Sequence, residues 1–331
     1  MSATSREERF DVAGPVEAVI EIDAGRIDVR LATPPAGDGT EQEPAPGVGT
    51  PEVRVEVTAD LEGAPGWVRG LAGLVDAAGG LERRFGVDLG SVVSGLGARP
   101  GEDPEERAAR AVAAVEIGVA DGRLTVHGPR EVVLRTVPLH VTVHAPADSG
   151  LRVRAGAAPV ELTGRPAEVD VRTTGGVTVD EVVVRGAVRC GAGDVSVRRV
   201  AGVLRVRGGA GDVTLDDVAA PVEVVTGSGS VTADRVAADL TVRCGSGNVT
   251  VRDATSGDLD LTTGAGAVRV GVHAGVDAAV DLRSAAGSAS SDLPVSSTRP
   301  EPAGGTAAGA PPLRIRGRSA AGTARVQSAS V

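Results

Sequence analysis

A pattern of apolar and polar positions repeats every eighteen residues through the second half of the chain. Within each repeat the apolar positions lie two residues apart, which is the spacing of one face of a β-strand. The pattern therefore predicts at least two short strands per repeat, with alternate side chains pointing inward. The columns are Val177, Val195, Val213, Val231 and Val249; Val197, Leu215, Ala233 and Val251; Val182, Val200, Val218 and Val236; Leu204, Val222, Leu240 and Leu259; and Val188, Val206, Val224, Val242 and Leu261.

These repeats predict a stack of coils. One coil cannot bury its own inward face, so neighbouring coils must supply the core. Coils stacked about 4.8 Å apart turn each column into a ladder of methyl groups, and such a core needs no aromatic side chains. The chain has two Phe, one Trp and no Tyr. We therefore predict an all-β fold, a single-stranded parallel β-helix or solenoid with coils of about eighteen residues, plus a small helical insertion.

Glycines and charges also keep fixed places in the repeat. Glycine pairs mark a sharp corner and predict positive φ: Gly191/Gly193, Gly209/Gly211, Gly227/Gly229 and Gly245/Gly247. One outward column alternates in sign from coil to coil, which predicts opposite charges side by side on neighbouring strands: Glu181, Arg199, Asp217, Arg235 and Asp253. Each such pair contributes about 0.2–1 kcal/mol.

The pattern divides the chain into five regions. They are 1–59, N-terminal β-strands that start the solenoid; 60–114, a helical insertion; 115–283, the solenoid coils; 284–312, a flexible loop rich in Ser, Ala, Gly and Pro; and 313–331, the last coil and C-terminal cap.

Local signals support this division. Helical spacing is seen at Trp67, Leu71, Leu74 and Ala78. Asp103 followed by Pro104 is a typical helix start, with an N-cap and a proline in the first turn. After the insertion, strands are predicted for VVLRTVPLHVTVHAPAD at 132–148. The last coil is predicted to point four side chains inward: Leu313, Ile315, Ala324 and Val326.

The order of several sequence blocks resembles a known family. The chain begins with FDVAGPVEAVIEIDAGRIDVR, continues with DGRLTV and PLHVTVHAPADSGLRVRAG, and ends in coils of the form (C/T)G(A/S)G(D/S/N)VxV. This order resembles the bacterial putative-adhesin family of β-strand-repeat domains, a family of unknown function. The resemblance covers most of the chain except the helical insertion and residues 284–312. It implies a parallel β-helix and a role in binding or at a surface.

Charge and composition narrow the function classes. The net charge is −10 and every basic residue other than histidine is an arginine. A generic nucleic-acid binder needs a basic stripe and usually stacking aromatics, so nucleic acid is not an expected partner. No run of eighteen apolar residues predicts a membrane-spanning segment. The first thirty residues contain no typical secretion signal, so we expect a cytoplasmic protein.

The two cysteines occupy the same place in the repeat. Cys190 and Cys244 are fifty-four residues apart, which is three coils. At about 4.8 Å per coil their Cα atoms should lie about 14 Å apart, beyond the roughly 7 Å limit for a disulfide.

Two patterns suggest metal chemistry. His140 and His144 lie four residues apart, and on a strand this spans about 13 Å, too far to share one ion. The segment GGAGDVTL at 208–215 is similar to a calcium-binding nonapeptide, but Val213 stands where that pattern requires aspartate. The polar column Asp194, Asp212 and Asn248 is more typical of Asx turns.

No sequence pattern predicts an active site. The acid pairs Asp216–Asp217 and Asp180–Glu181 lie at coil turns, and neither a nucleophile elbow nor a phosphate-binding loop is present. We expect no enzyme, no cofactor, and no catalytic, cofactor-binding or metal residues. We predict a non-catalytic binding or scaffold solenoid that acts through its flat ladder faces on an unknown protein or surface partner. Two alternatives stay open: a calcium-dependent surface module and a carbohydrate-active β-helix enzyme.

Overall fold

The computed structural model describes residues 4–32, 51–60, 103–293 and 313–329. The chain divides into two compact units, Met1–Thr178 and Val179–Val331. In both units most of the described residues form β-strands that stack in parallel, and the all-β solenoid expected from the repeat is confirmed. One strand, β11 (Val177–Val182), contains the boundary between the units.

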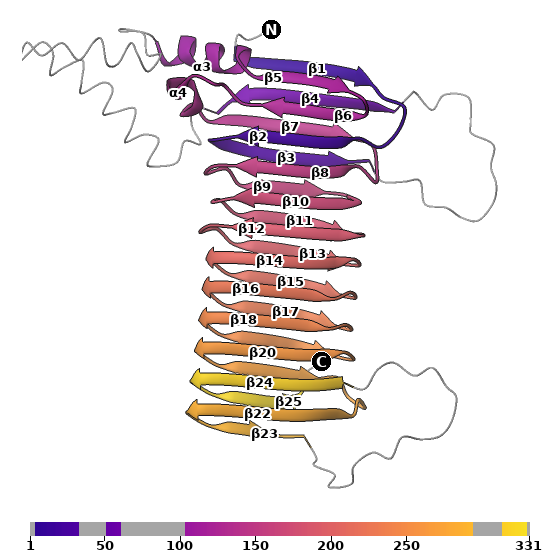
Figure 1. The fold of residues 1–331 in the computed structure, drawn as a ribbon, viewed down its shortest axis with the longest axis vertical. Helices are drawn as coiled ribbons and strands as arrows, with labels where there is room; N and C mark the ends of the chain where they lie inside the picture. The colour runs from indigo at the N-terminus through magenta and orange to yellow at the C-terminus, as the bar shows by residue number, and fades with distance from the viewer. Residues whose placement is uncertain (1–3, 33–50, 61–102, 294–312, 330–331) are drawn as a thin grey trace, which may run out of the picture. The chain divides into compact units, whose positions relative to one another are not determined.

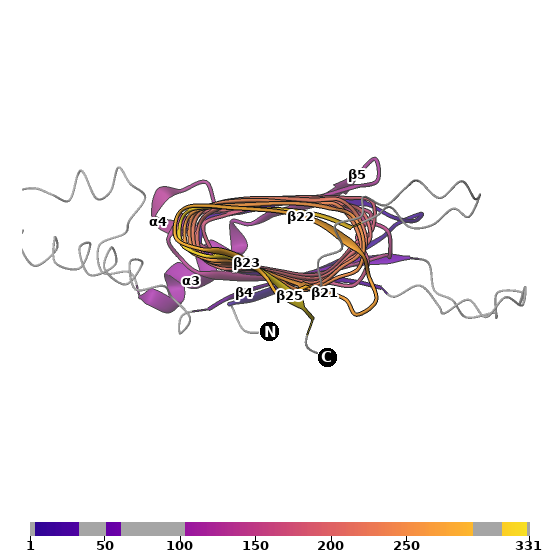
Figure 2. The same ribbon diagram turned by 90° about the horizontal axis from the view of Figure 1, so that it is seen from below.

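In the second unit the chain alternates between two parallel sheets, which form the long sides of a flattened ring (Figure 2). Sheet A contains, in spatial order, β13 (Val195–Val200), β15 (Val213–Val218), β17 (Val231–Val236), β19 (Val249–Ala254), β21 (Val268–Val272), β25 (Ala324–Ser328) and β23 (Ala289–Ser291). Sheet B contains β12 (Arg185–Cys190), β14 (Val203–Ala210), β16 (Val222–Ser228), β18 (Leu240–Ser246), β20 (Asp258–Ala265), β24 (Leu313–Ala321) and β22 (Ala278–Ala286).

The valine columns form the core of this unit. Val195 pairs in register with Val213, Val213 with Val231, and Val231 with Val249. Each of these side chains is at most 2% exposed. Sheet B repeats the arrangement with the column of Leu204, Val222, Leu240 and Leu259. The inward positions expected from the sequence are therefore confirmed.

The corner glycines are required by close approach of the backbone. The second glycine of three pairs has a positive φ: Gly211, Gly229 and Gly247. A Cβ atom at Gly229 would lie 2.1 Å from the carbonyl oxygen of Gly211 in the preceding coil. The positive φ expected for the whole corner holds only at these second glycines, and it is not found at Gly193.

A polar column lines the inside of each corner. Its side chains donate hydrogen bonds to corner carbonyls: Cys190, Thr226, Cys244, Thr263, Ser319 and Ser284. The Cys244 thiol, for example, donates to the Gly229 carbonyl at 3.3 Å between Sγ and O. The registers run from Cys190 to Gly208, then to Thr226, then to Cys244, so the spacing of three coils is confirmed. Both cysteines are buried free thiols.

The coil that comes last in the sequence is not last in space. Strand β24 pairs with both β20 and β22, and β25 pairs with both β21 and β23 (Figure 1). Leu313, Ile315, Ala324 and Val326 are buried as expected. However, the expectation that residues 313–331 form the terminal cap is wrong, because the coil of residues 278–291 lies beyond them.

The first residues of the loop predicted at 284–312 form β-strand instead. Strand β22 continues to Ala286, and β23 follows at Ala289–Ser291. Small side chains such as Ser284 and Ala289 fit the coil in register with Ser319 and Ala324. The remainder of this region lies outside the described residues.

The first unit is built from the same kind of coil but with a different order. One sheet runs β1 (Ser5–Asp11), β4 (Glu52–Ala59), β7 (Leu139–Ala145), β3 (Gly25–Leu31) and β9 (Val160–Thr163). The other runs β5 (Glu116–Ala120), β6 (Arg123–His127), β2 (Glu17–Ile22), β8 (Gly150–Ala155) and β10 (Glu168–Thr173). Strands β1, β4 and β5 pair antiparallel to their neighbours, and the other pairings are parallel.

The N-terminal coil is therefore inserted into the stack. Strand β2 lies between β6 and β8, and β3 lies between β7 and β9. The sequence predicted that residues 1–59 start the solenoid, but in space the β2–β3 coil has a neighbour on each side.

Two helices in the described residues of this unit accompany these strands. Helix α3 (Pro104–Ala113) begins as predicted, because the Asp103 side chain accepts a hydrogen bond from the Glu105 amide. Helix α4 (Val132–Arg135) replaces the beginning of the predicted strand at 132–148. Its local hydrogen bonds to the Glu131 carbonyl turn the chain while Val133 and Leu134 are buried, so tertiary packing overrides β-propensity. The helical spacing near Trp67 lies outside the described residues.

No helix in the described part of the chain has the length and apolar character needed to cross a membrane.

Candidate binding face

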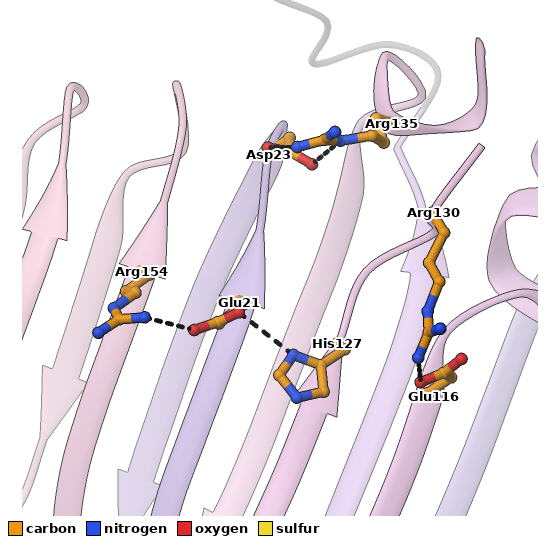
Figure 3. Close-up of polar contacts among 7 residues, drawn as sticks. All are labelled: Glu21, Asp23, Glu116, His127, Arg130, Arg135 and Arg154. Carbon is orange, nitrogen blue, oxygen red and sulfur yellow. Dashed lines mark hydrogen bonds and ion pairs between the residues drawn. The ribbon is translucent and has the colours of Figure 1, made fainter. Parts of the chain in front are cut away.

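Ion pairs lie along the outward face of the sheet in the first unit that contains β2, β6 and β8 (Figure 3). Glu21 on β2 lies between Arg154 of β8 and His127 of β6, with N–O distances of 3.0 and 3.4 Å. Nearby, Arg135 donates two hydrogen bonds to Asp23, at 2.6 and 3.0 Å, and Arg130 contacts Glu116 at 2.9 Å.

These contacts serve to position the N-terminal coil. Glu21 and Asp23 belong to or follow β2, whereas their partners come from sequence more than one hundred residues later. The Asp23 carboxylate raises the pKa of Arg135 chiefly by accepting its hydrogen bond. Because the charges here are matched within the unit, this face offers little uncompensated charge to a ligand.

A histidine–carboxylate pair lies on the opposite sheet of the first unit. His140 Nε2 is 2.8 Å from Asp28 Oδ2, and the Thr142 hydroxyl is 3.4 Å from the same nitrogen. Burial opposes ionisation of Asp28, but hydrogen bonds from Arg26 and His140 outweigh it, so the pKa of Asp28 is lowered.

This arrangement lacks the geometry of a nucleophilic triad. In a triad the nucleophile and the carboxylate contact opposite nitrogens of the imidazole ring, so that the histidine can accept a proton from the nucleophile. Here Thr142 and Asp28 share Nε2. The cluster is therefore suited to packing and charge balance.

Two other histidines, His273 and His144, also lie beside charged side chains of neighbouring strands. His273 Nδ1 is 3.0 Å from Asp253 Oδ1. His144 lies near Arg30 and Arg54, and its pKa is lowered, first by burial and then by these two arginines. The separation of His140 from His144 expected from the sequence thus corresponds to two different environments on β7. Among the described residues, no group of three or more His, Cys, Asp or Glu side chains is placed to hold a metal ion.

The polar column Asp194, Asp212 and Asn248, next to the segment that is similar to a calcium motif, accepts hydrogen bonds from backbone amides. Asp194 Oδ1 accepts a hydrogen bond from the Asp212 amide, and Asp212 Oδ1 accepts one from the Ser230 amide. Asn248 Oδ1 accepts from the Ala267 amide at 2.9 Å. The sequence suggested turns within one coil, but these bonds join each coil to the next.

The outward face of sheet A is largely charge-paired. The registers Arg199–Asp217, Asp217–Arg235 and Arg235–Asp253 place the predicted alternating column as expected. Within that column only Glu181–Arg199 closes to an ion pair, at 3.8 Å. The adjacent column adds Asp180–Arg198 and Asp234–Arg252, both at 3.1 Å.

The outward face of sheet B differs. Four exposed arginines of β12, β14 and β18 have side chains that make no hydrogen bond or ion pair with any other described residue. We call them the arginine face: Arg185 and Arg189 on β12, Arg207 on β14, and Arg243 on β18.

Like charges are adjacent in the arginine face. Arg189 lies directly opposite Arg207 in the parallel register, and Arg243 follows two coils further on, with Val225 between them. Like charges directly opposite on neighbouring strands are destabilising. Among the arginines of β12, β14 and β18, only Arg205 has an acidic partner within reach, Glu223 at 3.4 Å. The guanidinium groups therefore form a row of unmatched charge on a flat surface.

This row of arginines was not among the features predicted from the sequence. The spacing of eighteen that aligns Val188 with Val206 also aligns Arg189 with Arg207, one position later. Comparing outward positions as well as inward ones reveals the signal.

The family comparison locates this face within a known domain. Residues 148–310 match the family model described as Toastrack DUF4097. Over these residues the chain is similar to the Toastrack family. The arginine face lies within the matched residues, and the family resemblance expected from the sequence is confirmed.

Several solved structures to which the chain is similar have adhesion-related descriptions. A "putative adhesin" from Bacteroides fragilis is 12% identical, with 97% of this chain and 96% of that chain covered and a TM-score of 0.35. A "putative adhesin" from Parabacteroides distasonis is 10% identical, with the same coverage and TM-score. A "putative cell adhesion protein" from Clostridium sporogenes is 9% identical, with 98% and 99% covered and a TM-score of 0.24.

Similarity at this level carries no argument for a shared ligand. No curated protein matches the chain. The binding chemistry of residues 148–310 must therefore be argued from their own surface.

Proposed function

We propose that the protein is a non-catalytic binding solenoid that acts through the flat faces of its coils. The arginine face contacts an anionic partner displayed by a protein or a surface. The carboxylates or phosphates of that partner accept hydrogen bonds from the planar guanidinium groups, which present their donors in a fork that matches both anions.

The contrast between the two sheets of the second unit carries this proposal. Arg198, Arg199 and Arg252 on sheet A have acidic neighbours within 4 Å. Arg189, Arg207 and Arg243 on sheet B occupy the same set of coils without such neighbours. A chain with a net charge of −10 repels polyanions overall, so binding to one requires a local surface of this kind.

The test compares binding of the full chain to immobilised polyglutamate and long-chain polyphosphate, with neutral dextran as a blank. Replacing Arg189, Arg207 and Arg243 together by glutamine should weaken binding by about ten-fold or more, since each charged hydrogen bond contributes substantially. Binding should also weaken as salt rises, because the screening length falls from about 10 Å at 0.1 M to about 3 Å at 1 M.

A matched control uses the paired arginines of sheet A. Replacing Arg198, Arg199 and Arg252 by glutamine removes the same charge from the opposite face and should leave binding to both polyanions nearly unchanged. Equal losses in the two triple variants, or no binding of the wild-type chain to either polyanion, would overturn the proposal.

A further inference from the structure

Among the described residues, the second unit ends in two strands with an unpaired edge. Strand β22 pairs only with β24 there, and β23 only with β25. Both edges lie at the same end of this unit, beyond the coil of β24 and β25 (Figure 1). Natural proteins usually protect such an edge with proline, a bulge, lysine or a very short strand. Strand β22 has nine residues and contains neither proline nor lysine.

The described residues cover the inward side chains of this end coil only in part. Val280 is 36% exposed, whereas Ile315, its partner in register on β24, is 1% exposed. None of the residues of β22 is buried. An additional strand beside β22 would cover the apolar surface of Val280 and Leu282.

The charges of β22 are self-complementary. The exposed side chains of Asp281 and Arg283 lie on either side of Leu282 and contact each other at 3.1 Å. If two copies of β22 pair antiparallel about Leu282, Asp281 of each copy lies opposite Arg283 of the other. The flanking Ala278, Ala279, Ala285 and Ala286 then face one another, and their small side chains permit close approach.

We propose that two copies of this chain associate end to end through β22. A two-fold axis perpendicular to sheet B joins the two edges and places the β23 edges at the same interface, so that both copies use the same surface. Backbone hydrogen bonds extend the sheet from one copy into the other, and the two Leu282 side chains meet at the axis. This association is independent of the arginine face.

Charge reversal tests the register. Sedimentation equilibrium of the wild-type full chain should show a dimer that dissociates on dilution. Asp281→Arg places arginine opposite arginine twice, and Arg283→Asp places aspartate opposite aspartate twice. Each single variant should raise the dimer dissociation constant about ten-fold or more while its circular dichroism and thermal unfolding stay close to wild type.

Two further samples combine the charge reversals and test whether opposite charges restore the dimer. The double variant Asp281→Arg/Arg283→Asp restores opposite charges and should dimerise nearly as well as wild type. An equimolar mixture of the two single variants, one of them tagged, should form the heterodimer in preference to either homodimer. A wild-type chain that is monomeric at high micromolar concentration would overturn the proposal. So would a dimer that is indifferent to both reversals, because it would use another surface.

Discussion

The Asp194 carboxylate accepts a hydrogen bond from the backbone amide of Asp212, one coil later, with 2.8 Å between Oδ1 and N. Asp212 repeats the contact with Ser230 at 2.7 Å. The carboxylates thus join consecutive coils at the corner, where the strand ladders end.

Replacing Asp212 by alanine should therefore destabilise the second unit by about 1–3 kcal/mol, since the Ser230 amide loses its acceptor. Asp212→Asn keeps a carbonyl oxygen at the same place and should cost less. Urea unfolding of the two variants measures the difference. If calcium, and not the amide, were the natural partner of this column, a chelator would lower the melting temperature of the wild-type chain, and we expect no such effect.

A charge in the valine column should be far more costly. Val231 is 1% exposed and has a valine on either side in the ladder. Val231→Asp should lower stability by several kcal/mol, because an unpaired carboxylate would be buried among methyl groups. Thr232→Asp, on the outward side of the same strand, is the control and should have a small effect in thermal unfolding. Similar melting temperatures for Val231→Asp and wild type would contradict the inward assignment.

Alanine substitutions at two glycines with positive φ should differ in their cost to stability. Gly229 has a φ of 111°, and an added Cβ would meet the Gly211 carbonyl oxygen. Gly275 also has a positive φ, 83°, but nothing lies within 4 Å of its Cβ position. Gly275→Ala should cost about 1–2 kcal/mol for the backbone conformation alone. Gly229→Ala should cost clearly more in the same denaturation assay, and equal losses would argue against the tight stacking of corners.

The two cysteines should remain reduced and slow to react. Burial raises the pKa of both the Cys190 and Cys244 thiols, which lowers the fraction of reactive thiolate. Alkylation followed by mass spectrometry should show slow labelling in the native protein and two labels after denaturation without reductant. A single disulfide-linked species would refute the separation of about 14 Å between their Cα atoms.

Acidification should weaken the first unit through His144. Its pKa lies below the ordinary value of 6.5, so between these two values the unfolded chain binds more protons than the folded chain. Stability from this group is fully present above about pH 6.5 and is lost as the pH falls below it. Replacing His144 by glutamine should flatten the decline in melting temperature between about pH 7 and pH 5. Curves of identical slope for variant and wild type would exclude this contribution.

The core could be predicted from the sequence because the length of the repeat determines which residues pair in neighbouring coils. Val195 and Val213 are eighteen residues apart, and the structure pairs them directly. The helix start at Asp103 was predictable for a similar reason, since capping depends on neighbouring residues. Helix α4 was not, because the burial of Val133 and Leu134 depends on packing between distant segments.

The repeat pattern also could not predict the order in which the last coils of the second unit stack. Ala324 lies between Val268 and Ala289 in the ladder, although it follows both of them in the sequence. Both alanines fit the column, so local sequence cannot decide which coil packs first. The arginine face, in contrast, could be predicted from the outward positions of the same repeat. Only the lack of acidic neighbours around Arg189, Arg207 and Arg243 had to be seen in the structure.

The inserted coils have a consequence for how the chain is assembled during synthesis. Strands β2 and β3 are synthesised early but find their neighbours only after residues 123–163 have been made. Strands β22 and β23 emerge before residues 313–328, yet their place in the stack exists only after β24 and β25 have docked. Coils such as those of β13 to β19 can add one by one as they appear. The first and last coils cannot, so folding of each unit must wait for contacts between distant parts of the chain, and such long-range contacts are slow to form.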